Sequence, residues 1–179
     1  MEKFDPATAI RQFSTDRLDV AHWDTALDHP ETRANLMDQI EALLTPPVLA
    51  PLPPHFAFDR NNADDWIAAR RETSEVYLVE RRDRPGLAGL LILAEIAPRE
   101  LYLGYLLAEA QWGQGVGGEL VRGLVSVLTR HPPLEVSAQV VTENIASARL
   151  LLGAGFRETG SDDEIRRFLL TLSDSTPTL

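Results

Sequence analysis

The chain has 179 residues, of which 44% are hydrophobic and 25% are charged, a composition that fits one globular domain and excludes whole-chain disorder and collagen-like fibres. It contains no cysteine, which excludes disulfide scaffolds, thiolate zinc sites and cysteine nucleophiles, and its four histidines form no close pair for a metal. The net charge of −10 disfavours nucleic-acid binding, and no run of about 20 apolar residues predicts a membrane span. Because the N-terminus lacks the apolar core of a signal peptide, we expect a cytoplasmic protein.

Hydrophobic spacing predicts a strand and several helices in the first part of the chain. We expect, in chain order, a loose or short helical lead-in at 1–14, a strand at 15–23, one or two helices at 24–45, and a helix beginning near Asn62 and Asp65. Five prolines between Pro46 and Pro54 predict an extended connector, because proline breaks a regular helix. This connector is either a plain surface loop or a wall of a substrate cleft.

Strands and helices alternate in the rest of the chain, after three strands that form an antiparallel meander. The expected elements are strands at 75–82, 87–97 and 101–108, a helix at 116–130, a strand at 134–141, a short helix at 145–153, and closing strands around Phe156 and at 165–172. We therefore expect a single domain over residues 15–172 and a frayed tail at 173–179.

Four glycines within the six positions 113–118 separate the strand at 101–108 from the helix that follows. Glycine lets the backbone turn sharply and approach a ligand closely. The first turn of a helix has N–H groups without intrahelical partners and a partial positive charge. The segment 111–119 therefore predicts a socket for a phosphate or diphosphate, with a simple connecting turn as the alternative.

Two common phosphate-binding motifs fit these glycines poorly. The nucleotide P-loop requires Lys and then Ser or Thr after its last glycine, where this chain has Glu119 and Leu120. The dinucleotide fingerprint GxGxxG matches residues 113–118 formally, but residues 109–112 separate it from the strand and no parallel βαβ unit precedes it. A nicotinamide-dependent oxidoreductase stays open as an alternative.

Two motifs together resemble a known family. The first is Gly104-Tyr105-Leu106-Leu107 followed by Trp112-Gly113-Gln114-Gly115-Val116-Gly117-Gly118-Glu119. The second is Asn144-Ile145-Ala146-Ser147 followed by Leu150-Leu151 and Gly155-Phe156. With a further match at Thr15-Asp16-Arg17-Leu18 and Trp23, they resemble the GNAT acetyltransferases, and among these the ribosomal-protein N-acetyltransferase (RimJ/RimL-like) branch. The resemblance is strongest over residues 101–157.

The resemblance implies a mixed α+β fold, the GNAT fold, with a mostly antiparallel twisted sheet of about seven strands, flanked by helices and splayed between the fourth and fifth core strands. It implies acetyl-CoA as co-substrate and no metal. The cofactor-binding roles that carry over are Leu106, Leu107 and Asn144 for pantetheine, the amides of Gln114, Gly115, Val116, Gly117 and Gly118 for the diphosphate, Ser147 near the thioester, and Arg149 for the CoA phosphates. The alternatives are a plain helix cap for Asn144 and a solvated side chain for Arg149.

The chain departs from the family at one catalytic position. Many members carry a tyrosine seven residues after the asparagine, thought to protonate the leaving thiolate, and here that residue is Leu151. Ser147 or water would have to serve instead. Glu95 is the candidate base or amine anchor, and Tyr105 is a further polar group near the expected cleft. Their alternatives are a sheet-edge charge and a packed aromatic side chain.

The expected reaction is direct attack of an amine on the thioester carbon, since no cysteine exists to form an acyl-enzyme. Deprotonating a lysine amine of pKa about 10.4 at pH 7 costs about 4.6 kcal/mol, against about 1 kcal/mol for an α-amine. Residues 101–160 hold only five of the 27 acidic residues. The acidity elsewhere favours a cationic acceptor, either a small amine or a peptide N-terminus, or else it serves solubility alone.

A non-catalytic acyl-CoA-binding regulatory module on the same fold is the alternative function, because a fold alone does not establish activity. We expect no nucleic-acid partner and no membrane partner. The identity of the acceptor and the oligomeric state, a homodimer included, are left open by the sequence.

Overall fold

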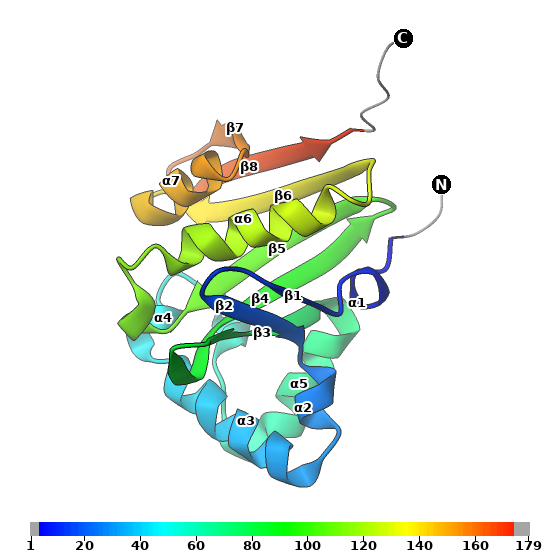
Figure 1. Ribbon diagram of the computed structural model, residues 1–179. Coiled ribbons are helices and arrows are strands. Elements are labelled where there is room, and N and C mark those ends of the chain that lie inside the picture. Colours follow the sequence, from blue (N-terminus) through cyan, green and yellow to red (C-terminus); the bar gives the residue numbers. More distant parts are fainter. Residues whose placement is uncertain (1–3, 174–179) are drawn as a thin grey trace.

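An open sheet of eight strands runs through residues 4–173, the part of the chain that the computed structural model describes (Figure 1). The strands are β1 (Gln12–Ser14), β2 (Leu18–His22), β3 (Glu75–Arg81), β4 (Arg84–Ala97), β5 (Glu100–Leu107), β6 (Leu134–Val141), β7 (Arg157–Ser161) and β8 (Ile165–Leu172). They are arranged in the order β1-β2-β3-β4-β5-β6-β8-β7, in which β5 and β6 are parallel and each other described pair is antiparallel. The expected mixed α+β fold is confirmed, with eight strands rather than about seven.

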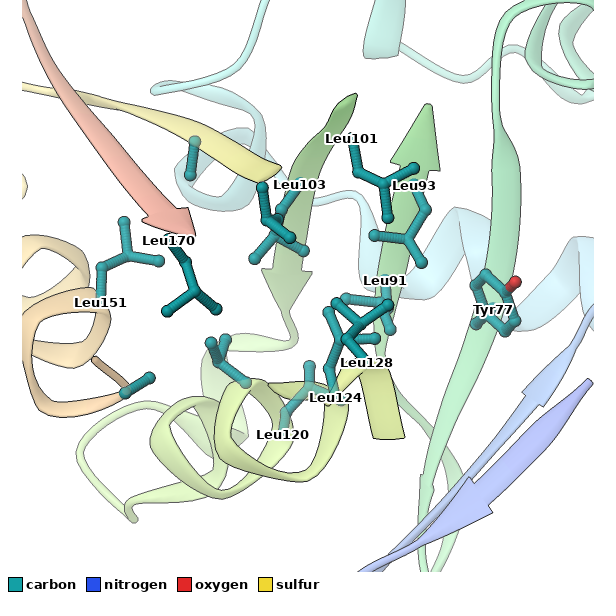
Figure 2. Close-up of a cluster of buried hydrophobic side chains, with 14 of the residues drawn as sticks. Tyr77, Leu91, Leu93, Leu101, Leu103, Leu120, Leu124, Leu128, Leu151 and Leu170 are labelled. Atoms are coloured by element: carbon teal, nitrogen blue, oxygen red, sulfur yellow. The ribbon is translucent and has the colours of Figure 1, made fainter. Parts of the chain in front are cut away.

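Helices cover both faces of the sheet and create two core clusters. They are α1 (Pro6–Ala9), α2 (Asp24–Leu27), α3 (Pro30–Leu43), α4 (Pro46–Leu49), α5 (Ala63–Thr73), α6 (Val116–Leu128) and α7 (Ile145–Gly153), with short 3-10 turns η1 (Pro54–Phe56), η2 (Arg60–Asn62) and η3 (Glu109–Gln111). In the first core cluster, α6 directs Leu120 and Leu124 towards leucines of β4 and β5 (Figure 2). The second core cluster packs α2 to α5 around Trp23 and Trp66. No helix within residues 4–173 is long and apolar enough to cross a membrane.

Two segments differ from the expectation drawn from the sequence. The segment 1–14, which we expected to be a loose or short helical lead-in, contains the short helix α1 but also the strand β1, whose Phe13 is buried in the first core cluster. The proline-rich connector is not uniformly extended, because α4 and η1 each begin with prolines. Proline fits the first turn of a helix, where an N–H needs no intrahelical partner. The tail 173–179, which we expected to fray, lies outside the described residues beyond Ser173.

The parallel pair β5–β6 separates part-way along its length. Its ladder ends at Leu103, paired with Ala138, although β5 continues to Leu107 and β6 to Val141. Beyond that point β5 stays paired with β4, and β6 stays paired with β8. The splay predicted between the fourth and fifth core strands is therefore present. It opens beside the start of α6, because a Cβ on Gly117 would lie 3.3 Å from the Leu107 side chain.

Candidate active site

The turn into α6 has the backbone shape that the glycine pattern predicted. Gly113 and Gly115 adopt left-handed conformations with φ of 71° and 75°, which glycine reaches without strain. Gly115 is the N-cap of α6 and offers no side chain to the helix N–H groups. The first N–H bonded inside the helix is that of Glu119, which donates to the Gly115 carbonyl at 3.1 Å. The N–H groups of residues 116–118 therefore have no acceptor within the described chain and are free for an anion.

Two glycines at the start of α6 differ in the space around them. A Cβ on Gly117 would lie 2.6 Å from the Leu150 side chain and 3.3 Å from that of Leu107, so close packing of α6 on α7 and β5 requires glycine there. A Cβ on Gly118 would meet the flexible end of Arg122 at 3.0 Å. A side chain at position 117 would therefore have to displace Leu150, whereas a small side chain at position 118 only displaces the end of Arg122.

Glu119 anchors the glycine loop to the start of β2. Its carboxylate accepts a hydrogen bond from the Thr15 hydroxyl at 2.5 Å, and two from Arg17, from its N–H at 2.8 Å and from Nε at 2.6 Å. Arg17 Nη1 also donates to the Gln114 carbonyl at 3.0 Å. Burial alone would raise the pKa of Glu119, but these donors outweigh it and hold the pKa below its usual value of 4.5.

Arg81, the last residue of β3, supports the loop from the other side. It is 8% exposed, and its Nη1 donates to the side-chain oxygens of Gln111 at 3.2 Å and Gln114 at 2.9 Å. Asp83 accepts from its other nitrogens at 2.7 and 2.6 Å, and these hydrogen bonds raise the pKa of Arg81 although burial opposes them. Gln114, which the resemblance assigned to the diphosphate, thus has its side chain engaged, and its N–H donates to the Gln111 carbonyl at 3.4 Å.

Strand register decides which backbone groups of β5 face the splay. The Ala108 N–H donates to the Ala88 carbonyl at 2.9 Å, and such bonded pairs alternate along an antiparallel ladder. Leu106, two residues earlier, therefore turns its N–H and C=O towards β4, while Tyr105 and Leu107 turn theirs into the splay. The family resemblance assigned the pantetheine contacts to the backbones of Leu106 and Leu107. The register agrees for Leu107, but it turns the backbone groups of Tyr105, and not those of Leu106, towards the splay.

The carbonyl of Leu107 has a partner of its own. Trp112 Nε1 donates to it at 3.0 Å, and the indole is 50% exposed at the end of β5. The Leu107 N–H and both backbone groups of Tyr105 thus form the edge that is open to a ligand. Trp112 fixes the boundary of that edge, a role that the motif did not predict.

At the start of α7, Asn144 caps the helix and keeps part of its side chain free. Its Oδ1 accepts from the Ser147 N–H at 3.1 Å, and its NH₂ group has no acceptor within residues 4–173. The cap and a ligand contact can therefore coexist. The nearby Tyr105 hydroxyl is buried and makes no hydrogen bond of good geometry, with the Ser147 side chain as a polar neighbour. Burial raises the pKa of this phenol, and the Ser147 side chain offsets part of the rise. Leu151, at the usual tyrosine position, is buried in the first core cluster.

A family model described as an acetyltransferase (GNAT) domain matches residues 10–157. The chain belongs to the GNAT acetyltransferase family. The match spans the glycine loop and the Asn144 motif, so both resemblances drawn from the sequence are confirmed at the level of the family. The family supports N-acetyltransferase activity and the use of acetyl-CoA. No curated protein matches the chain significantly in sequence.

Solved structures of other GNAT proteins share the fold. An acetyltransferase (GNAT family) from Bacillus anthracis superposes with a TM-score of 0.72 at 12% identity, over 89% of this chain and 98% of that one. RimL, a ribosomal L7/L12 α-N-protein acetyltransferase in complex with coenzyme A, gives 0.69 at 16% identity, over 88% and 96%. Spermidine N-acetyltransferase from Vibrio cholerae, in complex with CoA and spermine, gives 0.64 at 14% identity, over 87% and 95%.

One predicted site residue, Glu95, is not brought into this GNAT site. Glu95 lies opposite Leu101, at the paired end of β5, and its Oε1 accepts from the Phe4 N–H at 2.8 Å and the Arg99 N–H at 3.2 Å. This carboxylate therefore ties the N-terminal segment to the β4–β5 turn. Arg149 is exposed on α7, and its role towards CoA stays a prediction. Within the described chain, no group of three or more His, Asp or Glu side chains could hold a metal ion.

Proposed function

We propose that this GNAT protein transfers the acetyl group of acetyl-CoA to a primary amine, by direct attack of the amine in a ternary complex. The observation that carries the proposal is the combination of free N–H groups at the start of α6 with the splay between β5 and β6 beside them. A diphosphate matches the N–H groups and the helix dipole. A chain of amides such as pantetheine matches an unpaired strand edge, as an added strand would.

In this proposal, the CoA diphosphate accepts hydrogen bonds from the N–H groups of residues 116–118. Pantetheine then runs along the backbone of Tyr105 and Leu107, and the free amide of Asn144 donates to it from the other side. Arg149, exposed on the same helix, is the candidate partner for the outer CoA phosphate. Each contact uses a donor or acceptor that has no partner in the described chain or, for Arg149, a side chain open to solvent.

The reaction joins the amine nitrogen to the thioester carbon and breaks the bond from that carbon to sulfur. The nitrogen gives up a proton to solvent, and the thiolate takes one up, so atoms and charge balance. Because burial raises the pKa of Tyr105, this phenol stays protonated at neutral pH. We assign to it, with Ser147, a hydrogen bond to the leaving sulfur. Glu95 is engaged elsewhere, so an α-amine, which deprotonates easily, suits the site better than a lysine.

The acceptor that we propose is a cationic amine, at a peptide N-terminus or on a small molecule. The acidity outside residues 101–160 favours a cation. Two proteins of the same fold also act on such amines, one on ribosomal protein L7/L12 and the other on spermidine. A homodimer and a cytoplasmic location stay predictions.

Thiol release from acetyl-CoA tests the activity. The panel holds a peptide with a free N-terminus, the same peptide blocked at the N-terminus but carrying lysine, spermidine, and an anionic amine. We expect release with the free N-terminus or spermidine. Exclusive use of the anionic amine would refute the cationic acceptor. Binding of acetyl-CoA without turnover across the panel would favour the non-catalytic acyl-CoA module instead.

The substitution Gly118→Asp tests the diphosphate site separately. A carboxylate in the first turn favours the helix dipole, so the melting temperature should stay equal or rise. The same carboxylate repels a diphosphate, and we expect CoA affinity to fall about 10- to 100-fold, an interaction of about 1–3 kcal/mol at close range. Gly118→Ala is the matched control and should bind CoA nearly normally. Equal affinity for both variants in calorimetry would place the diphosphate elsewhere.

A further inference from the structure

A pocket that shares no residue with the proposed acetyl-CoA site lies between α5 and the segment 55–62. Its volume is about 650 Å³, which is within the range of small-molecule sites. Trp66 and Arg70, one helical turn apart on α5, line it together with the carboxylates of Asp65 and Glu72. The pocket therefore combines an aromatic ring with both positive and negative side chains, which can bind the apolar and charged parts of a small molecule.

Arg70 is the unusual member of this pocket. It is 6% exposed, yet no carboxylate pairs with it within the described chain. Its Nη2 donates to the His55 carbonyl, and its guanidinium carbon lies 4.5 Å from the centroid of the Phe56 ring and 5.1 Å from that of Trp66. Nε is buried without a partner, and Nη1 makes no hydrogen bond in residues 4–173. A buried guanidinium is normally matched by a carboxylate, so the pairing group is missing here.

Trp66, which also lines the pocket, has an unsatisfied donor of its own. Its side chain is buried, and Nε1 has no hydrogen-bond partner in the described chain. Buried polar groups in native proteins are nearly always satisfied. Arg70 Nε and Trp66 Nε1 are both fully buried, whereas Arg70 Nη1 has no hydrogen bond in the described chain and is not fully buried, so Nη1 is the donor that an anionic acceptor such as a carboxylate can reach.

The rim of the pocket carries the opposite charge. Asp65 and Glu72 are exposed, and no hydrogen bond or ion pair engages their side chains within residues 4–173. A purely anionic ligand would be repelled by these groups, whereas an ammonium group would be attracted. The lining between them is mostly apolar, with Ala57, Ala69 and the Trp66 ring.

We propose that this pocket binds a small zwitterion with an apolar side chain, of the size of an amino acid or dipeptide. The carboxylate of the ligand pairs with Arg70 Nη1, and its ammonium group lies between Asp65 and Glu72. The apolar side chain covers the Trp66 ring. The proposal is independent of acetyl transfer, because it rests on groups of α5 and the segment before it.

Calorimetric titration of the full chain with L-phenylalanine, its amide and its N-acetyl derivative tests both charges of the ligand. We expect saturable binding of phenylalanine and affinity at least about tenfold lower for each derivative, because each lacks one ion pair. Absence of binding at about 10 mM phenylalanine, or equal affinity of all three compounds, would overturn the proposal.

Variants then locate the binding. Arg70→Met should abolish it, whereas Arg71→Met, the same change at an exposed neighbour paired with Asp24, should leave it unchanged. Asp65→Asn, at an exposed position that does not endanger the fold, should weaken phenylalanine binding and spare the N-acetyl derivative. Gly118→Asp should bind phenylalanine normally, which separates this pocket from the acetyl-CoA site. Undiminished binding in Arg70→Met and Asp65→Asn would place the ligand elsewhere and refute the assignment.

Discussion

Arg81 and Arg70 are buried to nearly the same degree, 8% and 6% exposed, but their surroundings differ completely. Arg81, beneath the glycine loop, bonds to one carboxylate and two glutamine side chains. Arg70, beside α5, rests on aromatic rings and uses one nitrogen on a backbone carbonyl. A buried charge that the fold itself satisfies holds the structure together, and one that the fold leaves unsatisfied is available to a ligand.

The same contrast separates the hydroxyl groups of two tyrosines, Tyr77 and Tyr105. The Tyr77 hydroxyl donates to the Pro6 carbonyl at 3.0 Å and ties α1 to the sheet. The Tyr105 hydroxyl, beside the splay, makes no hydrogen bond of good geometry in the described chain. We therefore expect loss of the satisfied groups to lower the free energy of unfolding, and loss of the unsatisfied groups to lower binding or turnover instead.

Glu119 accepts three hydrogen bonds that join the glycine loop to the start of β2, so its removal should have the largest effect. In Glu119→Gln the new NH₂ group would face donors of Thr15 or Arg17, and we expect the free energy of unfolding to fall by about 2–4 kcal/mol. Urea unfolding measures this, and CoA affinity should fall as the loop loosens. Glu143→Gln, an exposed carboxamide change near α7, is the control. Equal stability of both variants would mean that the loop does not depend on these hydrogen bonds.

The two arginines can be compared directly through the same substitution. Arg81→Met leaves Asp83, Gln111 and Gln114 without their donor, and we expect the free energy of unfolding to fall by about 1–3 kcal/mol. Arg70→Met removes an unpaired charge, and we expect a change of less than about 1 kcal/mol in either direction. The measurement is urea unfolding of both variants. A larger loss for Arg70→Met than for Arg81→Met would reverse the comparison.

Removing the hydroxyl group of Tyr105 or of Tyr77 should have a smaller effect than the changes above. The first removal should affect kcat, and the second should affect stability. Tyr105→Phe should leave stability unchanged and lower kcat about tenfold, with the KM for acetyl-CoA unchanged, because only the leaving sulfur loses a hydrogen bond. Tyr77→Phe should keep kcat and lose about 1 kcal/mol of stability. Steady-state kinetics and thermal unfolding of both variants check this. If Tyr105→Phe loses stability and keeps kcat, its hydroxyl serves the fold and not the reaction.

Local sequence patterns predicted the elements around the site well. The strand at 134–141 and the helix at 145–153 appear with the predicted bounds, since alternating apolar residues and a capping asparagine define them locally. The pattern missed β1, which is too short for its alternation to be recognised, and the helical turns that begin with proline. Local patterns do not show which short segments will find a partner in the sheet.

The sequence predicted those parts of the site whose donors come from one continuous segment of the chain. The free N–H groups at 116–118 follow from glycines before a helix, and the Asn144 cap follows from its own spacing. Strand register decides that Tyr105 rather than Leu106 faces the splay, and a pattern of one strand does not contain the register. Glu119 meets Thr15 across 104 residues of chain, a contact that exists only once the sheet is assembled.

The dependence of the free energy of unfolding on pH tests whether the charge of Glu119 stabilises the protein. The pKa of Glu119 lies below 4.5 in the folded protein, so the unfolded chain binds the proton more tightly than the folded one. Its contribution to stability is therefore complete above pH 4.5 and is lost as the pH falls through the lowered pKa. The free energies of unfolding of the natural chain and of Glu119→Gln, which differ at about pH 7, should converge as the pH falls through the lowered pKa of Glu119. A constant difference would show that the loop needs the two acceptor oxygens of Glu119 and not their charge, and the satisfied groups would then act through hydrogen-bond geometry.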